Sequence, residues 1–300
     1  MPRLLFITLS NIGDLVLTTP ALEALHHGYP DHLIDVVADT RSSVLLRACP
    51  YLGTLYHRQK SDGIRGLLGL VTELRKRRYT AIVDLRTDYL PWLLRGDRRA
   101  SRWRRPPHGI HAVEQHFAIT SQVFPFAVAL PVTRVWVSPE DIASAKTLLA
   151  KKTRGRWLAL APGANWAGKI WPVSHFAALV AAVTDIFDGV IILGSPPDAV
   201  AAEILIENCP LPCLNVVGKT SLTVAAAVCD EVDAFVGNDS GLGHIAAARG
   251  IPTLTLFGPG RPDRYVPWGP KASRVLAPAE DLKALQAPVV GAALRALLAR

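Results

Sequence analysis

The sequence predicts an α/β protein made of two doubly wound parallel-sheet domains that face each other across a cleft. Short apolar runs alternate with helical patterns through the first half of the 300 residues, and the same alternation resumes in the second half. A polar break at residues 151–155 separates the two series. Half of the residues are hydrophobic and 19% are charged, which supplies packed cores and argues against a disordered chain.

In the N-terminal domain, expected at residues 1–153, apolar runs predict buried strands at 4–7, 33–37 and 81–85. Helical spacing of apolar residues predicts helices at 14–27, 44–48 and 64–77. Ser138 begins one more helix, which we expect to run to about residue 152, because Ser is a favoured N-cap and Pro139 suits the first turn.

In the C-terminal domain, expected at residues 154–300, the same criteria predict strands at 157–161, 189–193, 234–236 and 253–257. Helices are predicted at 175–187, 198–208, 222–229 and 241–249. A last helix at about 289–298 closes the chain, and we allow for its packing back on the N-terminal domain. Open parallel sheets bind ligands beyond the carboxyl ends of their strands, so we expect the site in the cleft between the two sheets.

The formal net charge is +8, and most of the basic excess lies in the first half of the chain. Residues 1–150 hold 19 Lys and Arg against 13 Asp and Glu, whereas residues 151–300 hold 14 against 12. Six arginines crowd one short stretch: Arg95, Arg98, Arg99, Arg102, Arg104 and Arg105. Such a stretch attracts phosphates on nucleic acid, lipid or substrate, and it is equally typical of a solvated surface loop.

The remaining composition favours a cytoplasmic protein. No charged segment precedes an apolar one at the N-terminus, so we expect no secretory signal. No apolar run reaches the roughly 18 residues that span a bilayer, so we expect contact with a membrane at most. The four cysteines then serve as small buried hydrophobes: Cys49, Cys209, Cys213 and Cys229. The chain contains no Asp-x-Asp pair of the kind that holds a metal, so we expect no metal.

The first candidate motif, residues 10–14, follows the first strand and opens the first helix. Gly13 permits a tight turn. Asp14 then lies at a helix N-terminus, where the helix dipole favours negative charge. Asp14 is either a simple N-cap or a carboxylate that acts as a general base in the cleft.

The second motif, residues 162–172, follows the first strand of the second half. Gly163 and Gly168 let backbone N–H groups approach an anion, and Lys169 adds a positive charge, so the loop suits a phosphate. It lacks the residue order of a Walker A loop. A surface loop with a solvated lysine is the alternative interpretation.

Two further motifs also follow strands. In residues 236–244, Asn238, Asp239 and Ser240 are potential helix caps, and two glycines leave bare N–H groups for a diphosphate. Asp239 would repel a phosphate, so we assign it to sugar hydroxyls or to holding the loop. Residues 257–264 and 267–269 form a Gly- and Pro-rich loop. Either Arg261 or Arg264 contacts phosphate there, or the loop is a plain structural turn.

Taken together, the four motifs resemble glycosyltransferase family 9, the lipopolysaccharide heptosyltransferases. The similarity runs through most of the chain and is densest at residues 13–14 with 19–22, 162–163 with 169–172, 237–244, and 257–259 with 267–269. The resemblance implies a GT-B fold, with an acceptor bound mainly by the N-terminal domain and a nucleotide sugar by the C-terminal domain. It also implies an inverting, metal-independent transfer of heptose or a related sugar from ADP-heptose or a similar donor, with no cofactor besides this substrate.

By resemblance, Asp14 is the general base and Lys169 contacts the donor phosphates. The resemblance and the motifs together give these donor-binding candidates: Gly163, Ala164, Asn165, Lys169, Asp198, Asp239, Ser240, Gly241, Leu242 and His244. The acceptor-binding candidates are Asn11, Gly13, Arg95, Arg98 and Arg99. The expected acceptor is a lipopolysaccharide core or another phosphorylated or lipid-linked glycan, with peripheral contact at the cytoplasmic face of the inner membrane.

Two departures from the family pattern bear on substrate choice. Ala164 and Asn165 stand where the family often carries hydroxyl residues, and residues 86–89 depart from the usual Gln-Gly or His-Gly. Other functions were weighed against transfer. A GT-B-like sugar-nucleotide epimerase would need no acceptor. A Rossmann dehydrogenase needs Gly-x-Gly-x-x-Gly, which residues 10–14 lack. A non-catalytic basic binding protein fits the arginines, but no nucleic-acid motif accompanies them, so we expect no nucleic-acid partner.

Overall fold

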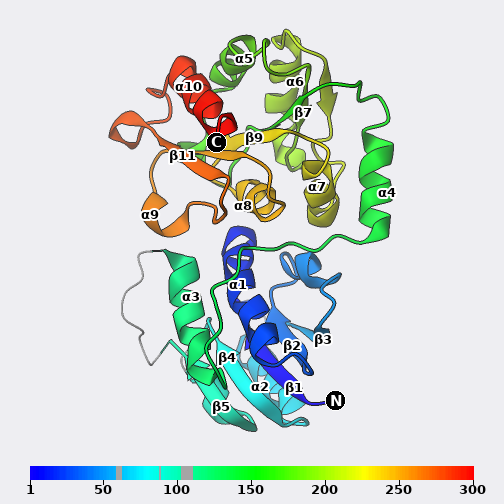
Figure 1. Cartoon of the computed structure of the whole chain (residues 1–300), viewed down its shortest axis with the longest axis vertical. Helices are drawn as coiled ribbons and strands as arrows, with labels where there is room; N and C mark the ends of the chain where they lie inside the picture. Colours follow the sequence, from blue (N-terminus) through cyan, green and yellow to red (C-terminus); the bar gives the residue numbers. More distant parts are fainter. Residues whose placement is uncertain (59–62, 88, 103–110) are drawn as a thin grey trace. The chain divides into compact units, whose positions relative to one another are not determined.

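The computed structural model describes residues 1–58, 63–87, 89–102 and 111–300, and its contacts divide the chain into two compact units, Met1–Trp136 and Val137–Arg300 (Figure 1). Within the described ranges, each unit contains one parallel sheet covered by helices. The predicted fold class, α/β with two doubly wound parallel-sheet domains, is confirmed. Arg104 and Arg105 of the arginine stretch, and Asp88, lie outside the described residues.

The first unit contains a sheet of strand order β3-β2-β1-β4-β5. Its strands are β1 (Arg3–Ile7), β2 (Leu33–Ala38), β3 (Leu52–His57), β4 (Tyr79–Asp84) and β5 (Gly96–Ser101). Its helices are α1 (Ile12–Gly28), α2 (Gly63–Leu74) and α3 (Ala112–Thr120), with short 3-10 turns η1 (Ser43–Leu46), η3 (Leu90–Leu93) and η4 (Ser121–Val123). The interpretation of the arginine stretch as a loop is wrong for β5, which pairs in parallel with β4 at the sheet edge.

Alternate side chains of each strand point to opposite faces of this sheet. Leu5 and Ile7 of β1 pack in one core cluster with Leu70 and Leu74 of α2 and with Leu90 of η3. α1 packs along α3. The cluster shared with β1 shows that α2 and η3 cover the same face of the sheet.

The second unit contains a sheet of order β11-β10-β9-β6-β7-β8. Its strands are β6 (Trp157–Ala161), β7 (Gly189–Ile192), β8 (Cys213–Asn215), β9 (Ala234–Asn238), β10 (Thr253–Phe257) and β11 (Ala272–Leu276). Its helices are α4 (Pro139–Leu148), α5 (Val173–Ala181), α6 (Ala199–Glu207), α7 (Leu222–Cys229), α8 (Gly241–Ala248), α9 (Pro262–Tyr265) and α10 (Ala287–Leu298). Three 3-10 turns complete it: η5 (Ala167–Lys169), η6 (Pro196–Asp198) and η7 (Pro278–Glu280).

The two faces of this second sheet have separate cores. Leu158 and Leu160 of β6 belong to a cluster with residues of α5, α6 and α10, whereas Trp157, Ala159 and Ala161 belong to a cluster with residues of α4, α7 and α8. This alternation at every second residue is what a strand buried on both faces produces. Both layers of helices are visible around the sheet in Figure 1.

The helix predicted to begin at Ser138 belongs to the second unit. α4 packs against α7, and the hydroxyl of Thr223 donates to the Asp141 carboxylate at 2.7 Å. For this reason the boundary between the two units lies between Trp136 and Val137, earlier in the chain than the boundary at 153/154 that we expected from the sequence. The buried side of α10 likewise packs on α5, β10 and β11 of its own unit.

Two further expectations concern cysteines and membranes. Cys49 and Cys229 are buried as expected, but Cys209 and Cys213 are only half-buried, and a hydrogen bond between these two thiols lowers the pKa of Cys209 to about 7. Among the described residues, no helix is both long and apolar enough to span a bilayer.

Gly189 lies where close packing in the core of the second unit excludes a side chain. A Cβ there would lie 2.5 Å from the Trp157 ring, which is 1% exposed and cannot move without disturbing the core. We expect Gly189→Ala to lower the free energy of unfolding by about 1–3 kcal/mol, measured by urea denaturation.

Gly291→Ala is the matched control. Gly291 lies inside α10, where a Cβ would make ordinary contact with Leu179 at 3.7 Å. This substitution should raise the free energy of unfolding by about 0.5–1 kcal/mol. Equal effects of the two substitutions would contradict the packing described for Gly189.

Candidate active site

Both sheets begin in an interior strand, and the chain later crosses to that strand's other side. The first unit runs from β1 to β2 and β3 before it crosses to β4, and the second runs from β6 to β7 and β8 before it crosses to β9. At such a switch point the loops that leave neighbouring strands diverge, which opens a crevice at the carboxyl ends. The candidate sites are therefore expected beside β1 and β4, and beside β6 and β9.

In the second unit, Lys169 and Asp239 meet at the switch point. Lys169 ends η5 in the loop after β6, and Asp239 directly follows β9. The Lys169 ammonium forms an ion pair with the Asp239 carboxylate, and their side chains are 30% and 12% exposed. The structure thus brings together two predicted donor-binding residues, and Asp239 holds Lys169 in place.

Asn238 fixes the loop that carries Lys169. Its side chain is fully buried, its amide donates to the Pro162 carbonyl at 2.6 Å, and its oxygen accepts from the Trp171 N–H at 3.0 Å. These two bonds hold both ends of the loop after β6 against the end of β9. The Trp171 indole is itself anchored to the Leu285 carbonyl at 2.8 Å.

The N-terminus of α8 adds hydrogen-bond donors to the same place. Ser240 is the N-cap but makes no capping bond with its side chain, and among the described residues its buried hydroxyl has no hydrogen-bond partner. The first N–H groups of a helix, here those of Gly241 and Leu242, have no partner within the helix and attract anions. His244 is buried within α8. Gly243 lets α8 approach β10, since a Cβ would lie 3.2 Å from the Thr255 hydroxyl.

Asp198 contacts the loop after β7 and lies close to the loop after β6. Its carboxylate accepts from the Ser195 N–H at 2.7 Å and from the Ser195 hydroxyl at 2.8 Å. Gly163 lies so near that a Cβ would be 2.1 Å from a carboxylate oxygen of Asp198. Ala164 and Asn165 continue the loop from Gly163, half-buried and exposed respectively. The predicted donor-binding residues therefore share one edge of the second sheet.

In the first unit, Asp14 lies in the first turn of α1, after β1. Asn11 stands at the N-cap position, yet its side chain makes no capping bond and instead donates to the Asp14 carboxylate at 2.8 Å. One carboxylate oxygen of Asp14 is thereby oriented by Asn11. Sequence analysis gave Asn11 an acceptor-binding role and missed this contact, for which the spacing of three residues across a helix start was the available signal.

Asp84 and Arg86 lie at the end of β4, on the other side of the first switch point. The Asp84 carboxylate is fully buried and accepts from the N–H groups of Arg86 at 2.8 Å and Thr87 at 2.7 Å. Burial raises the pKa of Asp84, and these hydrogen bonds oppose the rise. Burial, together with the nearby charge of Arg58, lowers the pKa of Arg86. Arg86 is thus a partly buried cation at this sheet edge, and sequence analysis did not select it.

The predicted acceptor-binding arginines lie elsewhere on the sheet. Arg98 and Arg99 pair with the middle of β4, and their guanidinium groups donate to backbone carbonyls, at 3.2 Å from Arg98 to Phe124 and at 3.0 Å from Arg99 to Pro91. Arg95 precedes β5, and its carbonyl accepts from the Tyr79 N–H at the amino end of β4. Asn11, Gly13 and Asp14 therefore lie together beyond the carboxyl end of β1. Arg95 lies at the amino ends of β4 and β5, on the opposite side of the sheet from Asp14.

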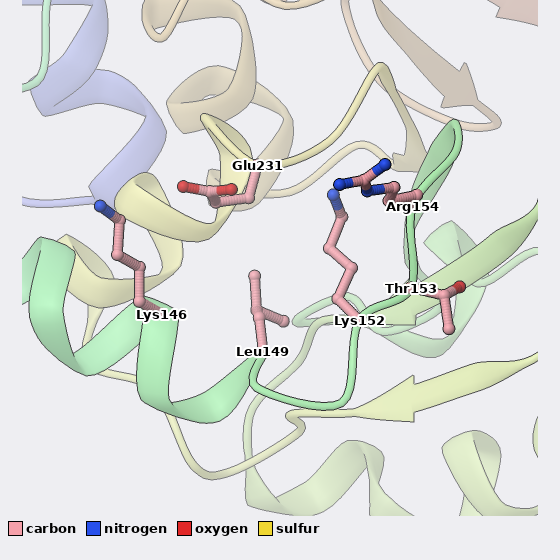
Figure 2. A pocket seen from close by; sticks show the side chains of 6 residues that line it. All are labelled: Lys146, Leu149, Lys152, Thr153, Arg154 and Glu231. Atoms are coloured by element: carbon pink, nitrogen blue, oxygen red, sulfur yellow. The ribbon is translucent and has the colours of Figure 1, made fainter.

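A separate basic cavity of about 290 Å³ lies in the second unit (Figure 2). It is lined by Lys146, Leu149, Lys152, Thr153, Arg154 and Glu231. Residues 153 and 154 precede β6, so this cavity lies toward the amino ends of the strands, and none of the predicted site residues lines it. Within the described parts of the chain, no group of three or more His, Cys, Asp or Glu side chains is placed to hold a metal ion.

Comparison with known proteins identifies the family. The family model for glycosyltransferase family 9 (heptosyltransferase) matches residues 95–289, which is more than half of the chain. The chain belongs to this family. It is therefore a glycosyltransferase, as the four motifs predicted.

Individual members of the family align over most of the chain. Lipooligosaccharide heptosyltransferase 2 of Haemophilus influenzae is 28% identical over 90% of this chain and 87% of its own length. Lipopolysaccharide heptosyltransferase 3 of Escherichia coli is 26% identical over 85% of this chain and 82% of its own. The solved structure of E. coli ADP-heptose lps heptosyltransferase II covers 99% of this chain and 98% of its own at 25% identity, with a TM-score of 0.78.

Asn238 allows a test of how the donor-side loop is held. Asn238→Asp keeps the acceptor for the Trp171 N–H but sets a carboxylate oxygen against the Pro162 carbonyl. Because this leaves buried polar groups without partners, we expect the free energy of unfolding to fall by about 1–3 kcal/mol in urea denaturation.

Asn208→Asp is the control for this prediction. The Asn208 amide also donates to a backbone carbonyl, that of Ile204 at 2.8 Å, but it is exposed to solvent. Its substitution should change stability by less than about 0.5 kcal/mol. A loss as large as that of Asn238→Asp would contradict the role assigned to Asn238.

Proposed function

We propose that this chain transfers a heptose, or a related sugar, from ADP-heptose or a similar nucleotide sugar to a hydroxyl of a lipopolysaccharide core or another glycan. The observation that carries the proposal is the meeting of Lys169 with the N-terminus of α8 at the switch point of the second sheet. A solved relative is named for ADP-heptose and lipopolysaccharide, which supports this choice of donor and acceptor.

The donor diphosphate is assigned to the second unit. Lys169 supplies a positive charge, and the first N–H groups of α8, which have no partner within that helix, supply hydrogen-bond donors. The Ser240 hydroxyl, which has no partner among the described residues, supplies another. These groups stabilise the charge that grows on the leaving nucleoside diphosphate, which is the largest catalytic contribution in such a displacement. The proposed transfer needs no cofactor besides the donor and no metal, because these groups carry that charge. Asp198, in the loop after β7, is assigned to the nucleoside.

The acceptor is assigned to the first unit, with Asp14 as general base. The oxygen of Asp14 that Asn11 does not hold takes the proton from the acceptor hydroxyl. The hydroxyl oxygen forms a bond to the anomeric carbon as the bond from that carbon to the diphosphate breaks, so the configuration inverts. Arg86, partly buried at the same sheet edge, is suited to a phosphate or carboxylate on the acceptor. A lipopolysaccharide core or another lipid-linked acceptor would bring the enzyme to the cytoplasmic face of the inner membrane.

Asp14→Asn tests the proposed base. The amide cannot take a proton, so we expect kcat for sugar transfer to fall about 10²–10⁴-fold while the Kd for ADP stays unchanged. Transfer would be followed by ADP release, and ADP binding by calorimetry. Asp31→Asn, at an exposed aspartate of the same unit, is the control and should transfer normally. Near-normal turnover by Asp14→Asn would remove Asp14 from the mechanism.

Lys169→Ala tests the proposed diphosphate site. The loss of a charge-assisted bond should raise the Kd for ADP about 10–100-fold. Lys146→Ala, in the separate basic cavity, should leave it unchanged. The proposal would be overturned if calorimetry gave the opposite pattern, because ADP would then bind in the cavity of Figure 2.

A further inference from the structure

One face of the first unit exposes an unusual set of large apolar side chains. Ile64 and Leu68 of α2 are 74% and 61% exposed. Three more lie within five residues in and beside η3: Tyr89, Trp92 and Leu93, which are 56%, 58% and 48% exposed. Single exposed apolar residues are normal, but a group of five on neighbouring elements marks an interaction surface.

These residues share one side of the sheet. The inward side chains of α2, such as Leu70 and Leu74, belong to one core cluster with Leu90 of η3 and with Leu94, which follows η3. Ile64 and Leu68 lie four residues apart and so project from one side of α2. The outward side chains of α2 and η3 therefore cover the outside of the same layer.

The turn that presents Trp92 is firmly held. The Arg99 guanidinium lies over the Trp92 ring at 5.7 Å and donates to the carbonyls of Pro91 at 3.0 Å and Leu94 at 3.2 Å. Leu90 and Leu94, on either side, are buried. The exposure of Trp92 and Leu93 is thus built into the fold, because the residues around them are fixed.

Two exposed arginines lie beside these apolar groups. Arg65, on α2, and Arg95, after η3, are both exposed, and no carboxylate of the described residues forms a salt bridge with either. The apolar side chains on α6 offer a contrast, since Val200 and Ile204 are 67% and 44% exposed but share that helix with Glu203 and Glu207. Of these two groups, the first has exposed arginines beside it, and Glu73 on α2 is paired with Lys76.

We propose that the docking face, defined as Ile64, Arg65, Leu68, Tyr89, Trp92, Leu93 and Arg95, binds the surface of an anionic phospholipid bilayer. Trp and Tyr side chains favour the boundary between lipid and water, aliphatic side chains enter the acyl region, and arginines attract anionic headgroups. The inference rests on the proposed function in one respect, because a lipid-linked acceptor gives the enzyme a reason to dwell at a membrane. Arg95, which was expected from the sequence to bind the acceptor, is here assigned to lipid headgroups instead.

Vesicle binding tests the docking face without any transfer reaction. The full chain is sedimented with vesicles of phosphatidylcholine alone and of equal parts phosphatidylcholine and phosphatidylglycerol. We expect binding to the second kind, weakened by salt. Ile64→Ser/Leu68→Ser and Trp92→Ser/Leu93→Ser should each lower the partition coefficient about tenfold or more, because each removes two side chains that enter the lipid. Arg65→Gln/Arg95→Gln should lower it on anionic vesicles only.

Val200→Ser/Ile204→Ser is the matched control and should bind like the unmodified chain. Failure of the unmodified chain to bind anionic vesicles, or an equal loss in the control, would overturn the docking face. All substituted residues are exposed, and unchanged thermal melting would show that each variant folds. Transfer to a lipid-free acceptor separates this inference from the proposed function: the variants should retain it, and its absence in the unmodified chain would count against the proposed function alone.

Discussion

The chain enters each sheet through an interior strand and later crosses to that strand's other side, and the candidate sites depend on this crossing. Beside β1 and β4, and again beside β6 and β9, consecutive loops leave the sheet in opposite directions. The candidate side chains are therefore carried on short turns whose bases are fixed by parallel strands. Asp14 in the first unit, and Lys169 and Asp239 in the second, all occupy such turns.

Buried polar side chains at the strand ends keep these turns in place. Asn238 holds both ends of the Lys169 loop, and Asp84 holds the turn after β4. Asp198, which is half-buried at the N-cap of α6, holds the turn after β7. Each of the three accepts from at least one backbone N–H group of a loop residue. A loop fixed in this way loses little conformational freedom when a ligand binds, which is what preorganised catalysis requires.

Strands and helices with a clear apolar period could be predicted from the sequence. β6, α7 and β10 occupy the predicted residues, since fully buried strands are continuous apolar runs and α7 begins after the capping Ser221. Edge elements escaped prediction. β5 carries Arg98 and Arg99, and charged residues are common on edge strands, which makes them resemble loops. α3 begins with a capping box at His111, a residue outside the usual capping set.

The turns that carry the candidate site residues could be predicted from the sequence, but the contacts between those residues could not. Strand ends followed by glycine identified the turns of Asp14, Lys169 and Asp239. The ion pair of Lys169 with Asp239 joins residues 70 apart and exists because β9 lies next to β6, an order that local sequence does not encode. The same holds for Arg95, which the strand register separates from Asp14. Pairing across a sheet is a property of topology, so it became visible only in the structure.

The proposed reaction is a single displacement in which the acceptor hydroxyl replaces the nucleoside diphosphate on the sugar. The most direct measurement is the anomeric configuration of the product, determined by NMR after incubation with ADP-heptose and a heptose-deficient lipopolysaccharide core. We expect a new glycosidic bond of configuration opposite to that of the donor, with one ADP released for each bond formed. A product that retains the donor configuration, or conversion of ADP-heptose without any acceptor, would contradict it.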